Sequence, residues 1–216
     1  LGGVRPEDIR RGWVGRALDN LDVTLADDGE ILVKGPVVMM GYWRNPKATE
    51  EAFTADGYLQ TGDVGEMDAD GFLRIIDRKK ELIVTAGGKN VAPQPIEAEL
   101  KSSPLFDTAV VVGEVRRFIA ALISPDFDQP ESWARANGVE AAGRDQLVAE
   151  PAVQGLFDEV VDGVNRALAR YEQIREYRLV TATLSVEGGQ LTPTMKIKRR
   201  VIDQEFAARI TEMYAP

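Results

Sequence analysis

Two Asp-Gly steps, each set between runs of alternating apolar and polar residues, strongly constrain how the first third of the chain can fold. One is Asp28-Gly29 in LDVTLADDGEILVKG, and the other is Asp70-Gly71 in YLQTGDVGEMDADGFLRIID. An Asp-Gly pair flanked by such alternation is a strong local signal for a β-hairpin. The sequence therefore predicts a β-rich start built on two hairpins.

A short helix is predicted between the two hairpins, in NPKATEEAF. Asn45 suits the N-cap, and Pro46 suits the first helical position, where its missing N–H costs nothing. Glu50 and Glu51 follow early in the segment and fit the same assignment.

The character of the chain changes at DRKKELIVTAGGKNVAP, where a charged cluster precedes a short strand-like run and a glycine pair. We place a domain boundary near Lys80, giving domains at 1–79 and 80–216. Beyond the boundary, PIEAELKSS predicts a helix, and DTAVVVGE and RRFIAALISPD predict buried strands. These elements indicate a small α/β unit with a mixed sheet, so the chain as a whole is assigned to the α+β class.

The rest of the chain is predicted to be largely helical. Apolar residues recur at three- and four-residue steps through residues 130–170, which is typical of a core-facing helical stripe. YRLVT predicts one further strand. VIDQEFAARITEMY predicts a single closing helix with Ile202, Phe206, Ile210 and Met213 on one face.

Composition narrows the chemistry that this chain can perform. It has no His and no Cys, which removes the commonest general base, thiolate nucleophiles and most metal sites, so no protein metal site is expected. The net charge is −9, with an acidic excess in both predicted domains, which argues against a nucleic-acid partner. No apolar run approaches the roughly 20 residues that span a bilayer. We expect a cytoplasmic protein, with peripheral contact at a membrane surface left open.

The stretch AGGKN invites comparison with a phosphate-binding loop, because glycines beside a lysine can cradle anions. It does not fit the Walker pattern: Ile83 stands where the first glycine is needed, and Asn90 replaces the Ser or Thr. No dinucleotide-binding, hydrolase or EF-hand motif is present either.

Several separated stretches together resemble one enzyme family. YLQTGDVGEMDADGFLRIIDRKKELIVTAGGKNVAPQPIE, then YEQIREYRLV and LTPTMKIKRRVI, follow the motif order of acyl-adenylate-forming enzymes, most closely the long-chain fatty-acyl-CoA ligases. The upstream GEILVKGPVVMMGYW is similar to the family's preceding segment. The resemblance covers essentially the whole chain.

The resemblance implies a fold and a reaction. Residues 1–79 would be the end of the large AMP-binding domain, including strands of its β-barrel subdomain, and 80–216 would be the mobile C-terminal lid domain. A fatty acid would react with ATP, accompanied by Mg, to give acyl-AMP and pyrophosphate, and CoA would then take the acyl group. The rest of the family's large N-terminal domain, with its phosphate loop and acyl pocket, is not in this sequence, so we expect a fragment that is inactive alone and whose partner is that missing part.

The resemblance also assigns roles at the nucleotide site. Asp63 in TGD is similar to the aspartate that binds both ribose hydroxyls, and Arg78 to the arginine that contacts the ribose from the other side. Lys80 falls at the family's hinge. The alternatives are a simple Thr-Gly-Asp turn for Asp63 and a solvated surface charge for Arg78.

Gly87, Gly88 and Lys89 resemble the loop that approaches the pantetheine arm of CoA. The alternative is a turn that needs a positive φ, and both roles can hold together.

Lys196 resembles the catalytic lysine of adenylation. It follows Thr194-Met195 where the commoner form of the motif has Ser-Gly. Lys198, Arg199 and Arg200 are expected to hold the start of the final helix in solvent or to meet an acidic or anionic surface.

Two other functions stay open at this point. One is another adenylate-forming ligase, acting on an aryl, medium-chain or amino acid, since the acyl pocket is not in the sequence. The other is a module that binds AMP or CoA without turnover.

Overall fold

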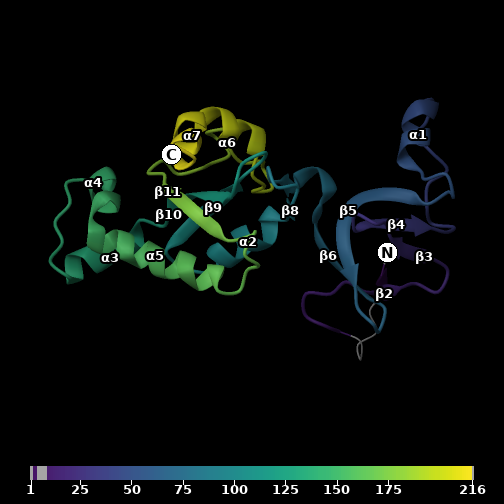
Figure 1. Cartoon of the computed structure of the whole chain (residues 1–216), viewed down its shortest axis with the longest axis horizontal. Helices are drawn as coiled ribbons and strands as arrows, with labels where there is room; N and C mark the ends of the chain where they lie inside the picture. The colour runs from purple at the N-terminus through teal and green to yellow at the C-terminus, as the bar shows by residue number, and fades with distance from the viewer. Residues whose placement is uncertain (1, 4–8, 216) are drawn as a thin grey trace. The chain divides into compact units, whose positions relative to one another are not determined.

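The computed structural model describes residues 2–3 and 9–215, which form two compact units, Leu1–Leu82 and Ile83–Pro216 (Figure 1). The chain passes from one unit to the other between Leu82 and Ile83. Each unit is described by itself below.

The first unit is built on one antiparallel sheet of six strands, in the order β1-β2-β6-β5-β4-β3. The strands are β1 (Gly2–Gly3), β2 (Gly15–Ala17), β3 (Asp22–Leu25), β4 (Glu30–Lys34), β5 (Leu59–Met67) and β6 (Phe72–Arg78). Both predicted hairpins are present, as β3–β4 and β5–β6, and they lie side by side in this single sheet. β1 and β2 were not predicted.

A small apolar cluster holds this sheet together. Its buried members are Leu21, Ile31, Val33 and Leu73. Cross-strand pairing of Val23 with Val33 and of Leu25 with Ile31 puts the alternating apolar residues of the β3–β4 hairpin on one face. The cluster is modest for a unit of this length, because most of the large apolar residues between 37 and 43 are exposed instead.

The predicted short helix is α1 (Pro46–Ala52), and the Asn45 side chain caps it by accepting a hydrogen bond from the Ala48 N–H at 3.1 Å. A single 3-10 turn, η2 (Lys79–Glu81), follows β6.

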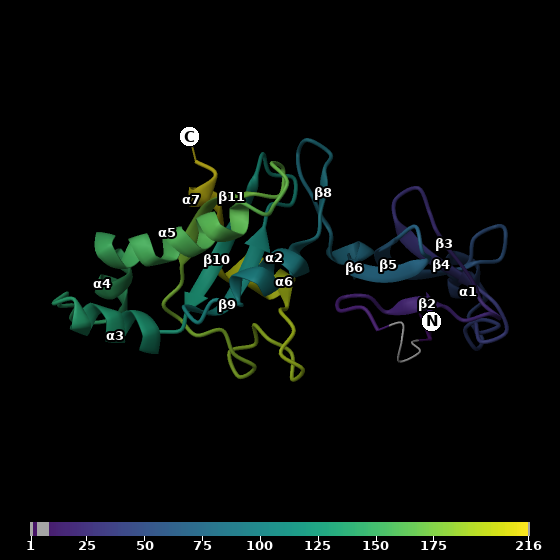
Figure 2. The ribbon, with the colours of Figure 1, turned by 90° about the horizontal axis from the view of Figure 1, so that it is seen from below.

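The second unit has a mixed three-stranded sheet covered on both faces (Figure 2). Its strands are β9 (Phe106–Val112), β10 (Ile119–Pro125) and β11 (Ile174–Leu179), with β10 antiparallel to β9 and parallel to β11. A two-stranded ribbon, β7 (Ile83–Val84) and β8 (Asn90–Val91), precedes it. The helices are α2 (Pro93–Leu100), α3 (Asp128–Ala136), α4 (Arg144–Ala149), α5 (Pro151–Asn165), α6 (Arg199–Glu205) and α7 (Ala207–Met213).

Two core clusters form because both faces of β9 and β10 are buried. Ala109 and Val111 pack with α2 and α5 on one face, whereas Val110 and Val112 pack with α6 and α7 on the other. A strand buried on both faces is a continuous apolar run in sequence, as in TAVVV and IAALI. The mixed sheet predicted for this part of the chain is therefore confirmed.

Three helix and strand predictions were wrong in their extents. The helical region 130–170 is broken, because α3 ends before Gly138, whose φ is 68°, and because Pro151 forces Glu150 out of the helical region before α5 begins. The closing helix is interrupted at Phe206, although its predicted face stays buried. β11 begins and ends earlier than YRLVT.

We predict that Phe157→Ala destabilises the second unit by about 3–5 kcal/mol, because it removes a fully buried ring and leaves a cavity. Phe157 stacks on Phe106 with ring centroids 5.7 Å apart. Native-state hydrogen exchange of β10 amides measures the change, and Glu159→Ala, at an exposed position of α5, is the matched control. Loss of less than 1 kcal/mol would contradict this description of the core.

Candidate functional site

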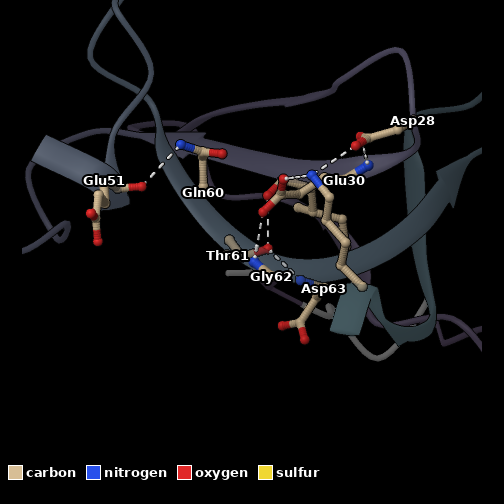
Figure 3. A network of polar contacts seen from close by, with 9 residues as sticks. Asp28, Glu30, Glu51, Gln60, Thr61, Gly62 and Asp63 are labelled. Carbon is tan, nitrogen blue, oxygen red and sulfur yellow. Dashed lines mark hydrogen bonds and ion pairs between the residues drawn. The ribbon is translucent and has the colours of Figure 1, made fainter. Parts of the chain in front are cut away.

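The segment that carries Asp63 is an irregular part of strand β5. Gly62 has a φ of 70°, and the register between β5 and β6 shifts after Val64. The Thr61 hydroxyl donates to the Ile31 carbonyl at 2.7 Å and accepts from the Asp63 N–H at 3.1 Å. These bonds fix the segment, and Figure 3 shows the Asp63 carboxylate pointing away from the polar residues behind it.

Asp63 and Arg78 are direct cross-strand partners in β5 and β6. Arg78 Nε lies 2.7 Å from Asp63 Oδ1, and the side chains are 53% and 19% exposed. The structure therefore brings together two residues that the sequence assigned to one ribose. Their nucleotide-binding role stays a prediction.

A buried carboxylate that the sequence analysis missed lies behind this pair. Glu30 accepts the Gly62 N–H through Oε1 at 2.9 Å and Lys79 Nζ through Oε2 at 2.7 Å, and its side chain is 4% exposed (Figure 3). Lys79 Nζ also lies 2.7 Å from Asp28 Oδ2. One acid thus bonds to the residue before Asp63 and to the residue after Arg78.

Lys80 is exposed in the middle of the 3-10 turn η2, directly after the anchored Lys79. Arg78 before the turn and Leu82 after it have extended dihedral angles. This geometry is compatible with a hinge, and the hinge role stays a prediction.

Gly87, Gly88 and Lys89 form the tip of the β7–β8 ribbon. The Thr85 N–H bonds to the Lys89 carbonyl at 3.0 Å, and the Lys89 N–H bonds to the Thr85 hydroxyl at 3.1 Å. Gly88 has a φ of 71°, so the turn requires a glycine there. The tip is exposed, and apart from the adjacent Gly87 and Lys89 no described residue has an atom within 4 Å of where a Gly88 Cβ would be, so a ligand has room to approach this backbone.

Lys196 lies on a tight hairpin of its own. The Thr192 N–H bonds to the Lys196 carbonyl at 2.8 Å, and the Met195 N–H bonds to the Thr192 carbonyl at 2.8 Å. Met195 has a φ of 60°, a left-handed conformation that suits the glycine of the commoner motif better than Met. The hairpin presents an exposed Lys196 side chain to solvent.

Arg199 has a structural role that the sequence did not indicate. It lies 2.9 Å from the largely buried Glu97, and it donates to the Val111 carbonyl at 3.1 Å. Glu97 also accepts the Val111 N–H at 2.8 Å. Arg199 thus contacts an acidic side chain rather than solvent alone, and it ties the segment that follows Lys196 to strand β9.

The sequence pattern could have indicated that Glu97 is a buried acid with a bonded partner, but no local pattern indicates this for Glu30. Glu97 lies one turn from Pro93 and from Leu100, on the buried side of α2, where an unpartnered acid would be costly. Glu30 starts an ordinary strand, and its partners Gly62 and Lys79 are distant in the chain. Only the tertiary structure identifies that network.

The described residues offer hydrogen-bonding and cationic groups in place of a metal centre. No group of three or more His, Cys, Asp and Glu side chains in residues 2–3 and 9–215 is arranged to hold a metal ion. In the same residues, no helix is both long and apolar enough to cross a membrane. The Asp63–Arg78 pair in the first unit offers a carboxylate and a guanidinium to a polar ligand, and Lys196 in the second unit offers an exposed ammonium group.

We predict that Asp28 titrates below 3.8 because it accepts a hydrogen bond from Lys79, which lowers the pKa of its carboxyl group. The hydrogen bond from Lys79 to Asp28, followed in importance by the one to Glu30, raises the pKa of Lys79 above 10.5. Ionised Asp28 therefore stabilises the folded state above pH ~4, and this stabilisation is lost as the pH falls through the lowered pKa.

Carboxyl-detected NMR measures the Asp28 titration directly. Lys79→Met should move the midpoint up towards 3.8, and Lys80→Met is the control. An unchanged midpoint in Lys79→Met would contradict the pairing.

The chain is similar in sequence to known proteins over most of its length. Residues 80–216 match the family model described as the AMP-binding enzyme C-terminal domain. The chain is 46% identical over 208 residues to the long-chain-fatty-acid–CoA ligase FadD15 of Mycobacterium tuberculosis, covering 96% of this chain and 34% of that protein. The chain thus spans about a third of the length of this curated relative.

Solved structures agree on the fold. The adenylation domain of a carboxylate reductase from Mycobacterium chelonae superposes with a TM-score of 0.71 at 23% identity, over 93% of this chain and 32% of that one. ATP-bound MatB from Rhodopseudomonas palustris gives 0.61 at 26% identity, over 94% and 37%. Residues 80–216 account for more than half of the sequence, and on that match the chain belongs to the AMP-binding enzyme C-terminal domain family.

Proposed function

We propose that this chain is the C-terminal portion of an AMP-forming long-chain fatty-acid–CoA ligase. A fatty-acid carboxylate oxygen attacks the α-phosphorus of ATP and pyrophosphate leaves. The CoA sulfur then attacks the acyl carbon of the acyl-AMP and AMP leaves. The observation that carries the proposal is the cross-strand pairing of Asp63 with Arg78.

The Asp63–Arg78 pair suits the ribose of a nucleotide. A carboxylate has two acceptor oxygens, and Arg78 Nε lies against one of them, so the other is available to a hydroxyl donor. Charge-assisted hydrogen bonds contribute about 1.5–3 kcal/mol each. Arg78 is rigid, planar and always charged, which favours a fixed contact on the other side of the ring. MatB, at 26% identity, was solved with ATP bound.

Lys196 supplies the charge for adenylation. Negative charge redistributes between the carboxylate and the α-phosphate during attack, and a compact ammonium on a flexible stem can follow it. The hairpin that carries Lys196 belongs to residues 80–216, which we propose to be a mobile lid. Rotation at Lys80 would exchange Lys196 for the Gly87–Lys89 loop between the two half-reactions.

The remainder of the enzyme would supply the acyl pocket and the rest of the nucleotide site. Exposed apolar side chains in the first unit fit this proposal. They are Val37, Met40, Tyr42 and Trp43. Such a cluster costs free energy in water and is expected to pack against protein outside this sequence. Mg²⁺ would enter with the ATP phosphates, as part of the substrate, and would neutralise their charge.

We expect Asp63→Ala in the complete ligase to weaken ATP binding by about 10- to 100-fold, the equivalent of one or two charge-assisted hydrogen bonds. The KM for ATP in ATP–pyrophosphate exchange measures this, and Asp27→Ala, at an exposed turn position, is the control. Unchanged ATP affinity would contradict the ribose role. The same assay with a panel of acids separates a long-chain ligase from an adenylate-former for other acids.

We expect Lys196→Ala in the complete ligase to slow adenylation by about 10²- to 10³-fold, the scale for removing one preorganised charge-stabilising donor. Thioester formation from supplied acyl-AMP should change much less, because the lysine would be withdrawn for that step. Lys198→Ala is the matched control on the same segment. Equal losses in both half-reactions would argue against the assignment.

The chain by itself should show no ATP–pyrophosphate exchange, because part of the nucleotide site would be absent. Exchange by the isolated chain would overturn the proposed division of the active site.

A further inference from the structure

The Glu30 carboxylate lies behind the Asp63–Arg78 pair and, like that of Asp77, it is one of the buried acidic side chains of the first unit. Its side chain is 4% exposed, whereas those of Asp28 and Asp63 are 45% and 19% exposed. A carboxylate this buried is costly unless its charge is balanced and its oxygens are bonded. Here each oxygen has one short contact, to the Gly62 N–H and to Lys79 Nζ.

These two contacts adjoin both members of the Asp63–Arg78 pair. Gly62 immediately precedes Asp63 at the end of an irregular, left-handed step in β5. Lys79 immediately follows Arg78 at the end of β6. Glu30 therefore joins the two chain segments from which Asp63 and Arg78 project, and Figure 3 shows the Asp63 carboxylate pointing away from it.

The contacts of Lys79 also restrict which residue after β6 can act as the hinge. Lys79 Nζ is held at 2.7 Å by both Glu30 and Asp28, which belong to the first unit. Lys80 is exposed, and no hydrogen bond or ion pair of its side chain is seen in the part of the chain that the structure describes. Anchoring of Lys79 leaves Lys80 as the first residue after β6 that can change its backbone angles without breaking this network.

We propose that Glu30 is a positioning residue of the adenylation site. Through Gly62 and Lys79 it holds Asp63 and Arg78 in place, and through Lys79 it also immobilises the residue that precedes the hinge. This inference rests on the proposed function. A shift of even ~1 Å in the side chains that bind the ligand is expected to reduce the reaction rate or the ligand affinity by up to about 10²-fold. Removing the Glu30 charge should therefore act on ATP rather than on the fatty acid.

The test compares Glu30→Gln with Asp28→Asn in the complete ligase. Both changes remove one negative charge from Lys79, but only Glu30 also bonds to Gly62. ATP–pyrophosphate exchange should show the KM for ATP raised about tenfold or more in Glu30→Gln. The KM for the fatty acid should stay within about twofold, and Asp28→Asn should change both KM values by less than about twofold.

A merely structural role for Glu30 predicts a different pattern. In that case Glu30→Gln would lower the melting temperature and the yield of active enzyme while both KM values stayed at the wild-type level. That result, or an equal rise of the ATP KM in Asp28→Asn, would overturn the proposal. Lys79→Arg, which keeps the positive charge, should retain an ATP KM closer to wild type than Lys79→Met does.

A second measurement separates this inference from the proposed function. If the wild-type ligase shows no exchange activity, the proposed function fails, and the positioning role is judged on the backbone instead. Hydrogen exchange of the Gly62 amide should then be at least about tenfold faster in Glu30→Ala than in Asp28→Ala. Equal exchange rates in the two variants would overturn the positioning role.

Discussion

A buried carboxylate shared between a main-chain N–H and a basic side chain organises each unit of this chain. In the first unit Glu30 joins the Gly62 N–H to Lys79, and in the second Glu97 joins the Val111 N–H to Arg199. Each acid replaces its lost hydration with one neutral and one charged donor, which makes its burial tolerable. The segments proposed to bind nucleotide and to carry out adenylation are both attached to these two points.

The three segments proposed to contact ligands each contain one residue in the left-handed conformation. Gly62, Gly88 and Met195 all adopt a positive φ, at 70°, 71° and 60°. In each case the neighbouring residue is one that the family resemblance assigns to ligand contact. At Gly88 and Met195 the left-handed residue lies in a tight turn, whereas Gly62 makes strand β5 irregular just before Asp63. Met195 is the exception in residue type, and its conformation explains why glycine is the commoner choice there.

The two units differ in the size of their hydrophobic cores. The second buries both faces of β9 and β10 under helices, with large side chains such as Phe157 fully enclosed. The first closes its sheet around a small cluster and leaves Met40 and Trp43 in solvent. Buried apolar area is the main source of folding free energy, so the second unit is the better candidate for independent stability. We propose that the first unit is part of a larger domain, which would cover these exposed side chains.

The sequence by itself determined the elements whose signals are local. Asp-Gly steps specified the hairpins, Asn45 and Pro46 specified the start of α1, and continuous apolar runs specified β9 and β10. The family resemblance added the candidate residues, because motif order is a property of the sequence. Tertiary structure alone decided which distant residues meet: Asp63 with Arg78 across two strands, and Glu30 with Lys79. Periodicity reports the environment of one segment, whereas these pairings depend on strand register and on a bulge that no local pattern encodes.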